Sequence, residues 1–85
     1  MQKFFIEVTD TFAGEANYSW VKRYVVNANT MRGAVNKFSR YINCSWKCVA
    51  DCGDMKRYNS KIDAACFFIS WYDEQIDTYL NIVEI

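Results

Sequence analysis

The segment from Met31 to Ile42 constrains the fold of this chain most, because its apolar residues recur with the period of a helix. They stand at offsets of 0, 3, 4, 7, 10 and 11, which places them in one stripe along a helix. Asn29 and Thr30 precede the stripe as helix-capping residues, and Asn43 is the predicted stop. The stripe consists of Met31, Ala34, Val35, Phe38, Tyr41 and Ile42. One amphipathic helix needs an apolar surface to cover, and the other segments predict a sheet.

Alternation of apolar and polar residues, the period of a strand, marks those segments. In the first strand Phe4, Ile6 and Val8 share one face. A loop over residues 10–17 follows, with Gly14 at a positive φ. Both faces of the second strand mix polar and apolar residues, which predicts a sheet covered on one side and half-buried or used for binding on the other. The predicted strands are residues 3–9, 18–28, 45–51, 55–58 and 63–72, and the last of these is predicted to be central because it is the most apolar.

Residues 76–85 fit two periods. A helix would align Ile76 with Leu80 and Val83, whereas a strand would align Ile76 with Thr78, Leu80 and Ile82. The β-branched and aromatic content favours the strand, with the helix as the alternative. The resulting order, β-β-α-β-β-β, predicts a two-layer α+β fold with one helix across a mostly antiparallel sheet. The 85 residues are expected to form a single domain, 1–85.

The side-chain inventory excludes most catalytic chemistry. The chain has no histidine and only three isolated glycines, so it lacks a Ser-His or Cys-His pair and a glycine-rich phosphate loop. Its close carboxylate pairs fall in predicted turns, where aspartate caps the backbone. We therefore expect no enzymatic activity and no cofactor.

Four cysteines, Cys44, Cys48, Cys52 and Cys66, raise the questions of metal binding and redox state. Their spacing differs from the two ligand pairs of structural zinc, and we expect no metal. In the predicted strand 45–51, Cys48 and Ala50 share a face with Trp46. The N-terminal apolar stretch ends at Glu7, too early for a signal peptide, and no apolar run approaches a membrane span of roughly 20 residues. We expect a cytoplasmic protein with reduced thiols, disulfides and zinc being the alternatives.

The stretch TDTFAGEANYSWVKR, from Thr9 to Arg23, resembles a recurrent opening of small proteins from phages, prophages and plasmids, TDTFGGEANYSWVRR. Ala13 stands where a glycine is usual, and Lys22 where an arginine is usual. The resemblance implies an origin in a mobile element, and small proteins from that source often inhibit host defences, among them anti-CRISPR proteins. It carries no catalytic residue over to this chain.

Three functions remain as hypotheses. The favoured one is a non-enzymatic protein-binding module, a stoichiometric inhibitor of a host protein or ribonucleoprotein complex such as CRISPR-Cas. Its exposed aromatic residues would form the contact, because interfaces favour Trp, Tyr and Arg. Tyr18 and Trp20 are expected on one face of the second strand. The predicted partner-binding residues are Glu15, Asn17, Tyr18, Trp20, Lys22, Arg32, Lys37 and Arg40.

Two alternatives use other features of the same sequence. A nucleic-acid-binding protein would use a basic face beside aromatic residues. That face would combine Lys22, Arg23, Arg32, Lys37, Arg40 and Lys47 with Trp20, Tyr24, Tyr41 and Trp46. A self-assembling structural or regulatory protein would instead bury the second face of its sheet in a homodimer. Phe67, Ile69 and Trp71 against Phe68 and Tyr72 mark the two apolar faces.

Overall fold

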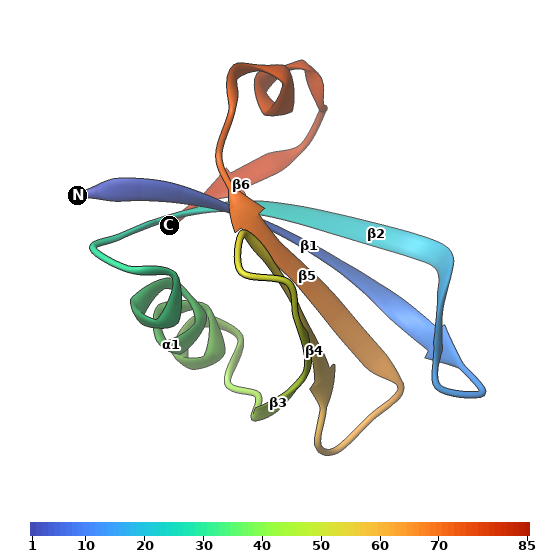
Figure 1. Cartoon of the computed structure of the whole chain (residues 1–85). Coiled ribbons are helices and arrows are strands. Elements are labelled where there is room, and N and C mark those ends of the chain that lie inside the picture. Colours follow the sequence, from blue (N-terminus) through green and yellow to red (C-terminus); the bar gives the residue numbers. More distant parts are fainter.

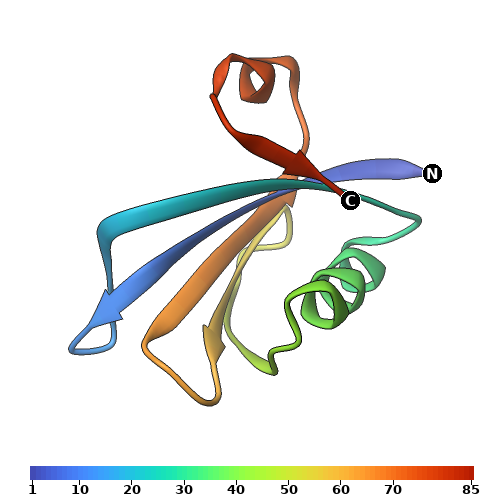
Figure 2. The same cartoon turned by 180° about the vertical axis from the view of Figure 1, so that it is seen from behind.

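The computed structural model describes residues 1–85 and confirms the predicted α+β fold, in which the order β-β-α-β-β-β is followed by a sixth strand. One helix lies on one side of the sheet, and a short 3-10 segment, η1, lies on the other side (Figures 1 and 2). None of the helices has both the length and the apolar character needed to cross a membrane. The elements are β1 (Gln2–Phe12), β2 (Glu15–Ala28), α1 (Met31–Ile42), β3 (Trp46–Asp51), β4 (Met55–Ser60), β5 (Ala65–Trp71), η1 (Glu74–Thr78) and β6 (Ile82–Glu84).

The sheet has the strand order β3-β4-β5-β1-β2-β6. Every neighbouring pair is antiparallel except β2 and β6, which run parallel. The apolar strand β5 lies between β4 and β1, as its composition predicted. The helix connects β2 to β3 and thereby carries the chain from one side of the β5–β1 centre to the other.

The core forms between the helix and the face of β1 that carries Phe4, Ile6 and Val8, as the alternation predicted. Thr30 caps the helix by accepting a hydrogen bond from the Gly33 backbone N–H at 3.0 Å. Burial of each large apolar side chain in such a core contributes about 1.5–3 kcal/mol. The eleven core residues are Phe4, Ile6, Val8, Val26, Ala28, Met31, Ala34, Val35, Phe38, Phe67 and Ile69.

The end of the helix corrects one prediction. Tyr41 belongs to the predicted apolar stripe, but it is 56% exposed, because it lies at the margin of the stripe, where its ring centroid is 6.0 Å from that of Tyr24. Asn43 ends the helix as predicted, with a left-handed backbone at φ 53°.

The face of the sheet opposite the helix is half-buried, because η1 covers part of it. Tyr79 follows η1 and stacks on Phe5 of β1, with ring centroids 5.9 Å apart. The guanidinium of Arg23 lies 4.2 Å from the same tyrosine ring and pairs with Glu7 at 3.1 Å. The strand predicted over residues 76–85 is restricted to β6, because residues 76–78 belong to η1 and residues 79–81 form bends.

Two irregularities also depart from the sequence expectation. The predicted loop over 10–17 is a hairpin with a two-residue turn, since Ala13 and Gly14 both have positive φ, 54° and 83°. In β3, a bulge between Cys48 and Ala50 breaks the alternation, so Ala50 pairs with Arg57 and leaves the face of Trp46.

Candidate functional site

The hairpin formed by β1 and β2 departs from a regular ladder beyond Thr9. Thr9 pairs with Val21, and Thr11 pairs with Ala16. Asp10 alone therefore faces the four residues of β2 between those partners, residues 17–20. We call Asp10 together with residues 17–20 the kink.

The carboxylate of Asp10 holds the kink in place. It accepts hydrogen bonds from the Asn17 side-chain amide at 2.9 Å, from the Ser19 backbone N–H at 3.0 Å and from the Ser19 hydroxyl. The bonds from Asn17 and Ser19 lower the pKa of Asp10 from its ordinary 3.8 to about 2, because they stabilise the charged form. Next to it, the buried Thr9 hydroxyl donates to the Trp20 carbonyl at 2.7 Å. The side chains of Thr9 and Asp10 therefore fix the backbone of residues 19 and 20.

The kink sends two aromatic side chains to opposite faces of the sheet, whereas the sequence predicted one face for both. Tyr18 adopts a left-handed backbone, φ 56°, which is uncommon for a residue with a Cβ. Its ring stacks on Phe68, on the face away from the helix, with centroids 6.5 Å apart. Trp20 emerges on the helix side, 43% exposed. Simple alternation fails because the kink inserts residues that have no partner on β1.

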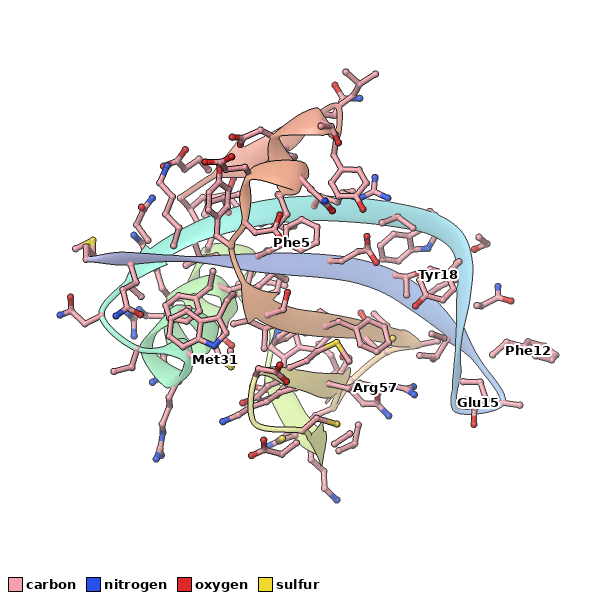
Figure 3. All side chains as sticks on the ribbon, turned by 45° about the horizontal axis from the view of Figure 1, so that its top comes forward. Phe5, Phe12, Glu15, Tyr18, Met31 and Arg57 are labelled. Carbon is pink, nitrogen blue, oxygen red and sulfur yellow. The ribbon has the colours of Figure 1, made fainter.

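The tip of the hairpin leans over the sheet and is tied to β4. An Nη of Arg57 donates to the Gly14 carbonyl at 2.8 Å, and its guanidinium lies over the Phe68 ring. Figure 3 shows Tyr18 over the sheet and Phe12 pointing away from it at the end of the hairpin. Sequence reasoning missed Arg57, because a contact across forty-three positions leaves no local pattern.

On the helix side, Trp20 borders a hollow of about 250 Å³ that we call the aromatic pocket. Lys22 and Asp63 supply one charge of each sign to its wall. The volume lies below the roughly 300–1,000 Å³ of small-molecule sites and suits a single large side chain better. Apart from these charges its wall is apolar, formed mainly by Trp20, Tyr24, Phe38, Ile42 and Trp46.

A second hollow lies along the flank of α1 that carries Arg32 and Asn36. The helix packs on β2 and β5, so the hairpin of β3 and β4 extends past it. The resulting space, about 420 Å³, is what we call the basic cleft. Burial raises the pKa of Tyr58 in its wall. The lining residues of the basic cleft are Arg32, Val35, Asn36, Ser39, Trp46, Cys48, Lys56 and Tyr58.

The eight predicted partner-binding residues do not form one patch. Glu15, Asn17 and Tyr18 lie in the hairpin, and Asn17 has a structural role there because its amide is bonded to Asp10. The other five residues lie in four separate places. Trp20 and Lys22 line the aromatic pocket, Arg32 lines the basic cleft, Lys37 donates to the Asn27 carbonyl, and Arg40 is exposed.

The basic face suggested for nucleic acid is likewise divided. Arg32 and Lys37 are five positions apart on the helix, which separates them by about 140° around its axis. Lys47 pairs with Asn59 on β4 and points away from the face of its neighbour Trp46. The basic residues therefore do not form a continuous track along the helix.

The cysteines and carboxylates do not converge either. All four cysteines are free thiols, and Cys66 alone is buried. Nowhere do three or more cysteine, aspartate or glutamate side chains come together in a way that could hold a metal ion. Comparisons with protein-family models, curated proteins and solved structures find no match to this chain.

Proposed function

We propose that this chain is a non-enzymatic protein-binding module that contacts its partner through the kink and the aromatic pocket. The observation that carries the proposal is that the Trp20 side chain is exposed although its backbone is held in place. This large side chain stays exposed at the mouth of an apolar pocket, while bonds from Thr9 and Asp10 fix the backbone around it. Tryptophan in such positions is typical of the few residues that dominate binding energy.

Rigidity of the kink supports the same function. A loop that is ordered before binding loses less conformational entropy when the partner arrives, which favours affinity. Asp10 supplies that order, and the exposed aromatic residues Phe12 and Tyr18 flank it on the hairpin. The pocket beside Trp20 offers room for one apolar side chain of the partner.

The resemblance of the hairpin motif supports a narrower role. On that basis the chain acts in the cytoplasm as a stoichiometric inhibitor from a mobile element, and its partner is a host defence complex such as CRISPR-Cas. The motif encodes the kink itself, so the proposed contact and the proposed origin rest on the same residues.

The test is affinity capture from a nuclease-treated bacterial host lysate, followed by reconstitution with the purified partner. We expect one partner at a fixed stoichiometry, lost with Trp20→Ala and kept with Trp71→Ala. Trp71 is the matched control, because it is also exposed but lies at the C-terminal end of β5 and does not line the aromatic pocket. Equal binding by both variants, or turnover of a substrate by the purified chain, would contradict the proposal. Loss of all partners after nuclease treatment would favour the nucleic-acid alternative, and a concentration-dependent dimer in light scattering would favour self-assembly.

A further inference from the structure

We propose that the basic cleft is a binding site for a phosphate monoester group, separate from the protein contact at Trp20. The two sides of the cleft belong to α1 and to the hairpin of β3 and β4. Arg32 and Asn36 are four positions apart and share the flank of the helix that borders the cleft. Lys56 and Tyr58 are two positions apart on β4 and share the face that borders it.

The charge of the cleft points to an anion. Its wall contains two basic residues, Arg32 and Lys56, and no acidic one. The three ion pairs of the molecule do not include Arg32, whose guanidinium is therefore free to pair with a ligand. Lys56 reaches Asp51 at 3.6 Å, but Asp51 lies outside the wall and its side chain is largely exposed.

Unused donors strengthen the assignment. Trp46 contributes to the wall of the cleft, and its buried indole N–H has no hydrogen-bond acceptor in the molecule. A buried donor without an acceptor is costly and calls for an explanation. Asn36 and Tyr58 add an amide and a phenol, so the wall offers guanidinium, ammonium, amide and hydroxyl donors together. A phosphate monoester, with three acceptor oxygens and nearly two negative charges, matches this set.

The shape of the cleft favours a monoester over a nucleic-acid backbone. A diester backbone is bound by several basic side chains in sequence along its path. Here the two bases converge on one hollow, and Lys37 lies on the opposite flank of the helix, where it is bonded to the Asn27 carbonyl. The volume of about 420 Å³ accommodates one phosphate group and a small organic group attached to it.

The test compares methyl phosphate with dimethyl phosphate at constant ionic strength, with the indole N–H resonances of the three tryptophans as the readout. We expect saturable binding of methyl phosphate that shifts the Trp46 resonance and leaves that of Trp71 unchanged. Dimethyl phosphate is expected to bind at least about tenfold more weakly, because it carries one charge fewer and forms weaker charge-assisted hydrogen bonds.

Two arginine variants make the assignment specific. Arg32→Gln is expected to weaken methyl phosphate binding at least about tenfold. Arg40→Gln, an equally exposed position on the same helix that does not line the cleft, is expected to bind as the parent does. No saturable shift, equal losses in both variants, or tighter binding of dimethyl phosphate would overturn the proposal. Because Trp20 lies outside the cleft, Trp20→Ala is expected to retain methyl phosphate binding, which separates this proposal from the protein contact.

Discussion

The aromatic pocket at the C-terminal end of α1 and the basic cleft along one flank of that helix differ in chemistry, although the same helix helps to form both. The pocket has apolar walls with one charge of each sign, whereas the cleft has two bases and no acid. Trp46 lines both hollows, with its indole between the helix and the sheet. Both hollows exist because a single helix does not cover the whole sheet. The core residues fix where the helix lies, and the residues around each hollow determine what it can bind.

The largest expected effect comes from removing the core side chain that lines the aromatic pocket and packs on Trp46, which lines both hollows. Phe38 is fully buried and its ring contacts those of Tyr24, Trp46 and Phe67. We expect Phe38→Ala to lower the free energy of unfolding by about 3–5 kcal/mol, because it leaves a cavity among these rings. Urea denaturation followed by tryptophan fluorescence measures the change. Tyr41→Ala, on the same helix but exposed, should lower the free energy of unfolding by less than about 1 kcal/mol. Equal losses in the two variants would contradict the central role of Phe38 in the core.

Acid is expected to act on the kink beside the aromatic pocket. The pKa of Asp10 is lowered from 3.8 to about 2 in the folded chain, so its ionised carboxylate stabilises the fold above pH 3.8. That contribution should disappear as the pH falls from 3.8 to about 2, and Asp10→Asn should lack it at every pH. Urea midpoints of the two chains across this range provide the measurement. Curves that stay a constant distance apart would contradict the assignment.

Asp10→Ala should also separate the two hollows at neutral pH. The variant removes the hydrogen bonds that order the kink, so partner binding through Trp20 should weaken. Methyl phosphate binding should persist, because Asp10 lies outside the basic cleft. Loss of both activities would show that the hollows are not independent.

A smaller effect is expected at Trp46, which lines both hollows. Trp46→Phe keeps an aromatic ring but removes the unpaired indole N–H. Relief of an unsatisfied buried donor, about 1–3 kcal/mol, should offset part of the lost apolar contact. We expect a net change in the free energy of unfolding within about 1 kcal/mol. A much larger loss in thermal or urea denaturation would indicate that the indole N–H has an acceptor in the folded chain.

The smallest expected effect lies in the turn of the hairpin, whose residues Ala13 and Gly14 line neither hollow. Ala13 has a φ of 54°, where a side chain is strained and where the related motif has glycine. Ala13→Gly relieves this strain but adds freedom to the unfolded chain, so the gain should stay below about 1 kcal/mol. Gly14→Ala, at φ 83°, is the opposite control and should destabilise the chain in the same assay.

The elements that the sequence predicted are those set by local periodicity. The stripe from Met31 to Phe38 and the alternation of β1 identify the helix, the buried face and the core, because burial selects apolar residues at regular intervals. The hairpin motif was also identified as the candidate site. Its geometry was not, because the kink depends on the side chain of Asp10 and not on periodicity.

Contacts between distant segments account for most of the remainder. The bond from Arg57 to Gly14 and the docking of Tyr79 on Phe5 join residues with no common local pattern. The basic cleft was missed for the same reason, since Arg32 was considered with bases of β2, α1 and β3 and not with Lys56. Lys56 and Tyr58 reach it from a different hairpin. Spacing along one segment cannot show which residues another segment brings beside it.

The position of β5 determines when the molecule can complete the centre of its sheet. A nascent chain emerging from the ribosome can form the β1–β2 hairpin early, yet the inner border of β1 has no partner until β5 has been translated through Trp71. Until then Phe4 and Ile6 lack the strand that pairs beside them. Closure between such distant segments is slow compared with hairpin formation. Insertion of β5, and not formation of the first hairpin, is therefore expected to set the pace of folding during synthesis.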